Sequence, residues 1–267
     1  MRRAAPGVDA AAALTPRLAL QFIGHSSLLV ELDGIRILTD PVTRSRVGPL
    51  RRTVAVPRRE HLHGIDVVLL SHLHWDHLDV PSLHDLGHHV PLVVSAGAGP
   101  WLKAAGFSDV REMSVGDSLE VGGVRIRAVP AVHSGFRPPM GPTAPALGFV
   151  IEGSRSIYFA GDTDLFAGMG DLGVPVDLAL LPVWGWGPTL GRGLHMDPLR
   201  AAESLRLIRP RAAIPIHWGT YWPYAMGRIL PERLVEPPAA FAEYASELAP
   251  DVRILPTAVG DDVSWEA

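Results

Sequence analysis

Three histidines and two aspartates lie within nine residues, 71–79, which read SHLHWDHLD. In an extended chain, side chains two residues apart point to the same side, so His72 and His74 can aim at one point. The chain is expected to turn into a helix near Asp79, and this turn would swing Asp76 and His77 to an adjacent point. Imidazole nitrogens and carboxylate oxygens bind divalent metals, and two ions roughly 3.5 to 4 Å apart could share such a cluster.

Three further candidate ligands follow apolar runs that are typical of β-strands. They are His133 after the run 124–129, Asp162 after the run 156–160 and His217 after the run 212–216. Each stands just beyond the carboxyl end of its run, where the loops of a sandwich converge. We therefore expect these three side chains to join those of residues 72–77 in one site at a single rim of the fold.

The sequence contains no cysteine, which excludes disulfides and thiolate metal sites. Five imidazoles and two carboxylates suit two divalent metal ions, with zinc preferred and manganese or iron as alternatives. A closed structural zinc site usually has four ligands around one ion, whereas seven ligands for two ions leave positions open to water. This count favours catalysis over the alternative of a metal-binding sensor or scaffold without turnover.

The elements that must position these residues begin with a β-meander. Apolar runs at 18–24, 27–32 and 35–39 indicate strands, and Asp33-Gly34 supplies a tight turn between the second and third. Residues 42–60 contain prolines and six arginines, which predicts a surface loop. The unbroken apolar run 65–70 is typical of a strand buried on both faces, and it leads directly into the histidine motif.

Helices and strands alternate in the second half of the chain. Asp79 with Pro81 predicts a helix start, further strands are expected at 91–95, 147–152, 178–182 and 252–255, and helices at 100–105, 198–208 and 239–248. A meander followed by alternation predicts an α/β fold, an αββα sandwich of two mixed β-sheets flanked by helices. We expect one domain at 17–267 preceded by a flexible leader at 1–16.

Composition narrows the classes of partner. The formal net charge of −4 argues against a surface that coats nucleic acid, so no nucleic-acid partner is expected. The N-terminus lacks the apolar core of a secretory signal, and no apolar run is long enough to span a bilayer. These features predict a cytoplasmic protein without a transmembrane segment, and they are compatible with a homo-oligomer.

The motifs HLHWDH, a later histidine, GDT and IHWG resemble those of the metallo-β-lactamase superfamily. The resemblance implies a hydrolase of that fold with a hydroxide bridging two metal ions as its nucleophile. It also implies a division of the ligands and a role for Asp76 in orienting the hydroxide. In that pattern the first ion is held by His72, His74 and His133, the second by Asp76, His77 and His217, and Asp162 bridges them.

Within the superfamily, the segments IGHSSLLVELDGIRILTDPV, IDVVLLSHLHWDHLD, GLHMDP and IHWGTY resemble the phospholipase D that hydrolyses N-acyl-phosphatidylethanolamines, together with its bacterial relatives. This branch implies a phosphodiesterase acting on a small-molecule or lipid-like substrate, and a lactonase or other ester hydrolase is the alternative. The chain departs from the phospholipase in lacking a long extension before its first strand and in the segment HSGFRPPMGP after His133. Both places could shape the substrate pocket.

The resemblance also suggests residues that contact substrate. His195 in GLHMDP is the candidate for binding the oxyanion or phosphate and for protonating the leaving oxygen; the alternative is a histidine that only hydrogen-bonds to backbone at the start of a helix. Trp184 and Tyr221, with Trp186 and Trp218, are candidates for the pocket wall, or for ordinary packing. For His25 we weigh orientation of a ligand against core packing. The arginines of loop 44–59 either recruit an anionic substrate or are simply solvated.

Overall fold

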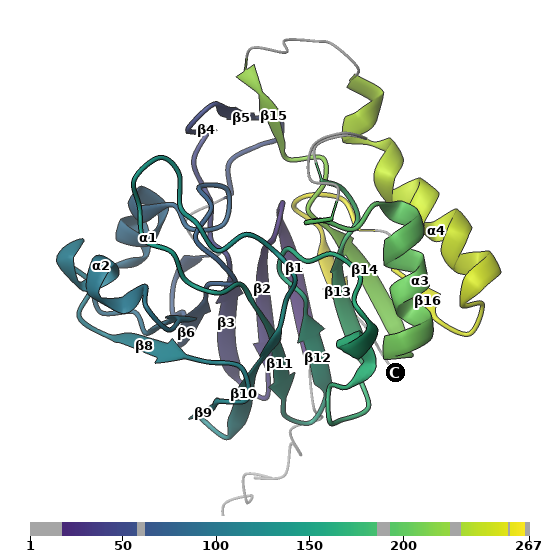
Figure 1. Cartoon of the computed structure of the whole chain (residues 1–267), viewed down its shortest axis with the longest axis horizontal. Helices are drawn as coiled ribbons and strands as arrows, with labels where there is room; N and C mark the ends of the chain where they lie inside the picture. The colour runs from purple at the N-terminus through teal and green to yellow at the C-terminus, as the bar shows by residue number, and fades with distance from the viewer. Residues whose placement is uncertain (1–17, 58–61, 186–192, 225–230, 256, 265–267) are drawn as a thin grey trace, which may run out of the picture.

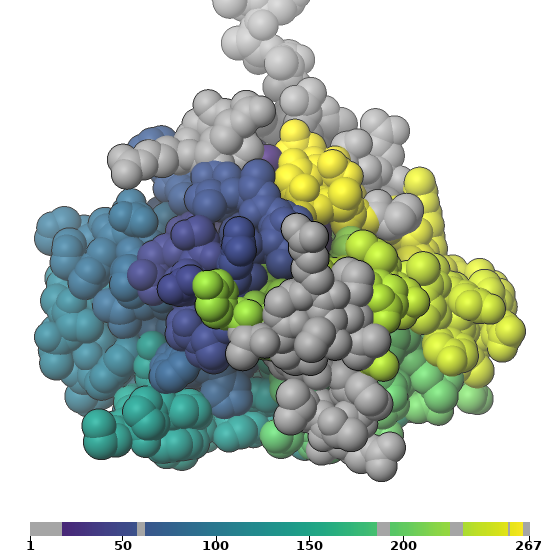
Figure 2. Space-filling model, turned by 90° about the horizontal axis from the view of Figure 1, so that it is seen from above, coloured from purple at the N-terminus to yellow at the C-terminus, as the bar shows by residue number. Residues whose placement is uncertain are grey.

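The computed structural model describes residues 18–57, 62–185, 193–224, 231–255 and 257–264. Two seven-stranded sheets face each other, and helices cover their outer faces (Figure 1). Seen from above, the N-terminal half lies on one side and the C-terminal half on the other (Figure 2). The αββα sandwich of two mixed sheets is therefore confirmed. The leader expected at 1–16 lies outside the described residues, and the single domain at 17–267 stays a prediction.

The first sheet has the order β17-β1-β2-β3-β6-β7-β8. Its strands β1, β2 and β3 form the expected antiparallel meander, whose second turn has positive φ at both Asp33 and Gly34, and β3, β6, β7 and β8 run parallel. The bounds are β1 Leu18–Gly24, β2 Ser27–Leu32, β3 Ile35–Thr39, β6 Val67–Leu69, β7 Leu92–Ser95, β8 Val110–Met113 and β17 Asp262–Ser264.

The second sheet has the order β16-β14-β13-β12-β11-β10-β9. It is antiparallel from β9 to β12 and parallel from β12 to β16, so it is a mixed sheet like the first. The bounds are β9 Ser118–Val121, β10 Val124–Pro130, β11 Leu147–Glu152, β12 Ser156–Phe159, β13 Leu178–Pro182, β14 Ala212–Ile216 and β16 Arg253–Ile254.

Helices α1 and α3 begin after aspartates that satisfy free backbone N–H groups. The carboxylates of Asp79 and Asp197 accept hydrogen bonds from the amides of Ser82 and Arg200, as the sequence predicts for helix N-caps. No helix among the described residues has the length and apolar character needed to cross a bilayer. The bounds are α1 Val80–Leu86, α2 Gly99–Ala104, η2 Ala167–Gly170, α3 Pro198–Ile208, η4 Pro231–Leu234 and α4 Glu236–Leu248.

The core has three apolar layers. The layer between the sheets contains Phe22 of the first sheet and Phe149 of the second, and each sheet also packs on its own helices. Strand β6 shows why its apolar run is unbroken: Val67 and Leu69 face the central layer, while Val68 and Leu70 face the layer under α1 and α2. The strand ends that carry the candidate ligands are thereby held rigidly.

The arginine-rich segment 42–60 differs from the loop that its composition predicts. Two short strands, β4 (Arg46–Val47) and β5 (Leu50–Arg52), pair with β15 (Tyr221–Pro223) in a three-stranded sheet above the sandwich (Figure 1). The prediction failed because the partner strand lies far along the chain. Short strands whose pairing is entirely non-local leave no clear local pattern.

Arg52 is buried, with 6% of its surface exposed. Its guanidinium donates to the carbonyl oxygens of Val42 at 3.1 Å, Ala55 at 3.0 Å and Ile23. The contact with Ile23 supports the backbone next to Gly24, where a Cβ would lie 3.1 Å from Arg52 Nη2. The hypothesis that Arg52 recruits an anionic substrate is therefore wrong, because its donors are used inside the protein.

We predict that Arg52→Met lowers the free energy of unfolding by about 3 kcal/mol, since it leaves the buried carbonyls of Ile23 and Val42 without these donors. Arg51 is the matched control because it is adjacent and exposed, and Arg51→Met should change stability by no more than about 0.5 kcal/mol. Urea titration of both variants measures the difference. Equal stability of the two would contradict the structural role of Arg52.

Candidate metal centre

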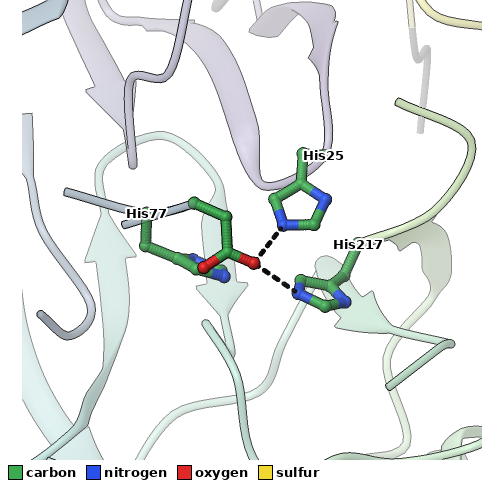
Figure 3. A group of neighbouring side chains, drawn as sticks. His25, His77 and His217 are labelled. Atoms are coloured by element: carbon green, nitrogen blue, oxygen red, sulfur yellow. Dashed lines mark hydrogen bonds and ion pairs between the residues drawn. The ribbon is translucent and has the colours of Figure 1, made fainter. Parts of the chain in front are cut away.

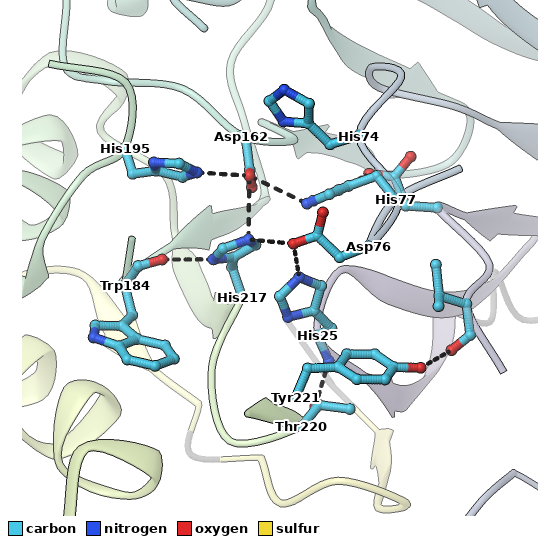
Figure 4. A network of polar contacts seen from close by, with 12 residues as sticks. His25, His74, Asp76, His77, Asp162, Trp184, His195, His217, Thr220 and Tyr221 are labelled. Atoms are coloured by element: carbon cyan, nitrogen blue, oxygen red, sulfur yellow. Dashed lines mark hydrogen bonds and ion pairs between the residues drawn. The ribbon is translucent and has the colours of Figure 1, made fainter. Parts of the chain in front are cut away.

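The seven candidate ligands come together at one rim of the sandwich. Segment 71–77 follows β6, His133 follows β10, Asp162 follows β12 and His217 follows β14. These strand ends converge because the central core layer holds the two sheets face to face. Figure 4 shows side chains from both halves of the chain turned toward a common centre.

One group of imidazoles surrounds a single point. His72 Nε2 and His133 Nε2 each lie 3.0 Å from His74 Nδ1. Around a tetrahedral zinc ion with Zn–N bonds of about 2.0–2.1 Å, nitrogen ligands would stand roughly 3.3 Å apart. The three nitrogens are therefore spaced nearly as a shared ion requires.

A second group lies beside the first. His217 Nε2 is 3.9 Å from Asp76 Oδ2, and His25 Nε2 donates to the same oxygen at 3.1 Å. Ligand atoms of His25, Asp76, His77 and His217 all lie within 4.8 Å of one another. Figure 3 shows the three histidines turned toward one another.

Asp162 stands between the two groups. Its Oδ2 atom is 3.1 Å from Nε2 of both His77 and His217, and 3.9 and 4.0 Å from Nε2 of His72 and His133. Its Oδ1 atom is buried and has no hydrogen-bond partner within the described part of the chain. The carboxylate thus has oxygen lone pairs available toward both groups, as a bridging ligand requires.

Hydrogen bonds on the far side of each ring set which nitrogen is protonated. His133 Nδ1 donates to the Leu194 carbonyl at 2.7 Å and His217 Nδ1 donates to the Trp184 carbonyl at 2.5 Å. In the neutral form of each ring, Nε2 then carries a lone pair that points into the centre. A lone pair facing the Asp162 carboxylate is unfavourable unless a cation lies between them, so the donor set fits divalent metal ions.

Burial lowers the pKa of His133 to about 4 and the pKa of His72 well below the usual value, so both rings are neutral near pH 7. For Asp162, burial alone would raise the pKa, but the surrounding imidazoles hold it well below the usual range. Burial would lower the pKa of His77, yet Asp162 and Asp40 raise it well above the usual value. The two carboxylates therefore favour positive charge at the His77 ring, which a bound metal ion would supply in place of a proton.

Asp40 is a functional candidate that sequence reasoning missed. Its Oδ2 accepts from His77 Nδ1 at 2.7 Å and from the Ser71 hydroxyl at 2.5 Å, and its Oδ1 accepts from the Ser71 amide at 2.7 Å. It is completely buried. The signal was its position directly after β3, the same kind of position that singled out the other ligands.

We predict that Asp40→Asn weakens metal binding by roughly 10- to 100-fold, because this carboxylate orients the His77 ring and increases its basicity. Titration against a chromophoric chelator measures the change. Asp66→Asn, at an exposed aspartate that accepts from the Arg36 amide, is the control. An unchanged affinity in Asp40→Asn would show that His77 does not depend on this contact.

Backbone strain concentrates at the centre. Among the described residues other than glycine, five have positive φ, and three of these line the site: His25 at 59°, Asp40 at 34° and His217 at 62°. Such conformations cost about 1–3 kcal/mol each and persist only where the surroundings enforce them. Here the His217 amide donates to the His25 carbonyl at 2.8 Å, and Thr220 Oγ1 accepts from the His25 amide at 2.6 Å.

Of the predicted substrate contacts, His195 reaches the centre, where its Nε2 lies 3.0 Å from Asp162 Oδ2. Burial alone would lower the pKa of His195, but the Asp162 carboxylate raises it. Tyr221 is buried, and its hydroxyl donates to the Arg44 carbonyl at 2.9 Å. Its buried position favours packing over substrate contact, which stays a prediction for both Tyr221 and Trp184.

The remaining aromatic candidates have different surroundings. Trp184 is 7% exposed and stacks on Trp222 with ring centroids 5.8 Å apart. Its carbonyl accepts the hydrogen bond from His217 Nδ1. Trp218 packs against Phe22 and donates to the Pro215 carbonyl. Trp186 lies outside the described residues. His25 contacts Asp76 directly, which favours orientation of a ligand over simple core packing.

Comparison with known proteins agrees with this geometry. A family model described as the β-lactamase superfamily domain matches residues 35–218, which include all seven predicted ligands and the four strands that precede them, β6, β10, β12 and β14. The chain belongs to the metallo-β-lactamase superfamily. The relatives with this fold include proteins described as metal-dependent hydrolases.

Relatives within the metallo-β-lactamase superfamily differ in length. N-acyl-phosphatidylethanolamine-hydrolyzing phospholipase D 1 of Caenorhabditis elegans is 33% identical over 225 residues, which cover 75% of this chain and 63% of that protein. A metal-dependent hydrolase of Methanopyrus kandleri is 30% identical over 253 residues, covering 89% and 96%. The solved structure of a metallo hydrolase from the archaeon Ignicoccus hospitalis has a TM-score of 0.72 at 23% identity, covering 94% and 99%, and it shares the fold.

Proposed function

We propose that this protein is a hydrolase with two divalent metal ions, most suitably zinc, that cleaves phosphodiester bonds. The observation that carries the proposal is the position of the Asp162 carboxylate, whose Oδ2 lies 3.1 Å from Nε2 of His77 and His217 and 3.9 to 4.0 Å from Nε2 of His72 and His133. A closed structural site would need neither the second group nor a bridging carboxylate.

The donor atoms of the centre divide into two sets and one bridge. When bound, two such ions lower the pKa of a shared water toward about 7 and polarise the bond under attack. In this assignment the first set is His72, His74 and His133, the second is Asp76, His77 and His217, and Asp162 is common to both.

The protein's own side chains supply orientation and a proton. His25 donates to Asp76 Oδ2 at 3.1 Å and so fixes the carboxylate that is proposed to orient the attacking water. His195 has 11% of its side chain exposed, whereas the Asp162 carboxylate beside it has 2% exposed. His195 therefore stands beside the proposed bridging carboxylate and is more exposed than it, and we assign His195 to binding the substrate's oxyanion and protonating the leaving oxygen.

The substrate class rests on similarity to the C. elegans phospholipase, of which this chain spans 63%. Only some arginines of loop 44–59 have a guanidinium group that an anionic substrate could reach. Arg44 is neutralised by a two-pronged ion pair with Asp79, and Arg52 is buried, which leaves Arg46 and Arg51 as the exposed candidates in the described part of loop 44–59. A lactonase or other ester hydrolase is the alternative with the same machinery.

A substrate screen tests the proposal. Metal-loaded protein is assayed with bis-p-nitrophenyl phosphate, a series of lactones, p-nitrophenyl esters and phospholipids, and each active substrate is repeated with His195→Gln. We expect phosphodiester hydrolysis that falls by roughly 10²-fold in His195→Gln. Turnover of lactones alone would favour the alternative, and no turnover of any substrate by protein with a full complement of metal would favour a sensor or scaffold.

A further inference from the structure

The segment after His133 forms a compact hairpin, residues 135–144, packed against the histidine motif. The Arg137 amide donates to the Pro142 carbonyl at 3.0 Å, the Gly141 amide donates to the Arg137 carbonyl at 2.9 Å, and Phe136 and Thr143 form a β-bridge. Its tip is apolar and exposed, whereas the side chain of Arg137 turns inward.

The Arg137 guanidinium joins the two ends of the turn that carries the candidate ligands. Its Nη1 atom donates to the Leu73 carbonyl at 2.6 Å and to the Leu78 carbonyl at 2.9 Å. Between these carbonyls lie His74, Asp76 and His77. The turn has only a few hydrogen bonds of its own, from the amides of residues 77 and 78 to the residue 74 carbonyl. The Arg137 guanidinium therefore sets the distance between the Leu73 and Leu78 carbonyls, which are the two ends of the turn.

Two neighbours fix Arg137 in turn. Its guanidinium lies over the Trp101 ring, 4.7 Å from the ring centroid. A Cβ added at Gly141 would lie 2.7 to 2.9 Å from the Cβ, Cγ and Cδ atoms of Arg137, so only glycine leaves room for the side chain to pass inward. The fold of the hairpin therefore determines where the Arg137 guanidinium lies.

We infer that Arg137 is a positioning residue, which holds the turn at residues 73–78 in the shape that its metal ligands need. The inference rests on the proposed metal centre and adds a link from the 135–144 hairpin to it. An arginine is suited to this role because its planar group can donate to two carbonyls while stacking on an aromatic ring. His133, just before the hairpin, joins the same group of nitrogens, so Arg137 couples two ligand-bearing segments.

The test compares Arg137→Met, which keeps the apolar stem but removes the donors, with Arg137→Lys, which keeps a charge and a single donor group. Arg125→Met is the control, because the Arg125 side chain is exposed and its guanidinium donates to the Ser118 hydroxyl, away from the histidine motif. We expect the zinc dissociation constant to rise by roughly 10- to 100-fold in Arg137→Met, by less in Arg137→Lys and not at all in Arg125→Met. Chelator competition measures these constants.

Amide hydrogen exchange of the metal-free proteins provides a second measurement. Exchange at residues 77 and 78 should be about tenfold faster in Arg137→Met, whereas the strands of both sheets should keep their protection. Lower global stability with unchanged zinc affinity and unchanged local exchange would overturn the inference, since it would leave only a structural role. If Arg137→Met does not fold, Gly141→Ala displaces the same side chain and should shift both measurements in the same direction.

The two measurements also separate this inference from the proposed function. If the parent protein binds no zinc, the proposed metal centre fails, and local exchange in the metal-free variants still decides whether Arg137 holds the turn. If the parent binds zinc and Arg137→Met matches it within about twofold in affinity and exchange, the metal centre stands and the role of Arg137 is refuted.

Discussion

Asp162→Asn is expected to abolish metal binding and turnover together. The substitution keeps the shape of the side chain but removes the negative charge next to Nε2 of His77, His195 and His217, which all lie within 3.1 Å of Oδ2. Without that charge, the two groups of ligands share no negatively charged side chain that could attract two cations. We expect turnover to fall by roughly 10³-fold or more. Elemental analysis after dialysis, together with steady-state kinetics, measures both losses.

Asp171→Asn is the control for this experiment, because Asp171 is an exposed aspartate shortly after the same strand. It should retain both metal and activity. The result that supports the proposal is that Asp162→Asn loses metal binding and turnover together. A variant that keeps its activity while its metal content is zero would refute the mechanism, and one that keeps both ions at parental affinity would remove Asp162 from the bridging position.

Removal of metal should produce the second large effect, a complete loss of activity accompanied by a lower melting temperature. Ions that bind only the folded state at 100 times their dissociation constant contribute about 2.7 kcal/mol for one site. In a protein of this size that amounts to a shift of about 5–10 °C in Tm. Without bound metal, the Asp162 and Asp40 carboxylates favour a positive charge on the buried His77 ring, because they raise its pKa.

Dialysis against a chelator, followed by calorimetry and assay before and after adding back zinc, manganese or iron, measures this effect. The ion that restores both Tm and activity at the lowest concentration identifies the preferred metal. The control is the metal-stripped Asp162→Asn variant, whose Tm should not respond to any of these ions. An unchanged Tm and full activity after verified removal of metal from the parent protein would contradict a catalytic metal centre.

Most strands were predicted from the sequence because burial leaves local patterns. The run 65–70 is apolar throughout, since β6 packs on both of its faces, and Asp33-Gly34 has the positive φ angles that its hairpin turn needs. Strands β8 and β9 were missed because their mixture of exposed and half-buried residues gives little contrast. Strands β15 and β17 were missed because they are short and pair with distant strands.

The candidate ligands were found because chemistry restricts both their type and their place. Imidazole and carboxylate groups that stand directly after apolar strands stand out in a chain with 12 histidines and no cysteine. Asp40 follows the same rule, but it acts through His77 rather than in the centre, and an aspartate after a strand is common at turns. No local sequence pattern indicated the role of Arg137, because the carbonyl groups that it contacts belong to residues about 60 positions away in the chain.

By itself, the sequence determined the two-sheet fold, the superfamily and the seven residues that could hold metal, because each of these depends on side-chain type and local periodicity. Only the tertiary structure decided that Asp162 lies between the two groups, that Asp40 contacts His77 and His25 contacts Asp76, and that Arg52 is internal while Arg51 is exposed. The physical reason is that such contacts join segments far apart in the chain. Their free energy depends on distances that exist only once both sheets have packed.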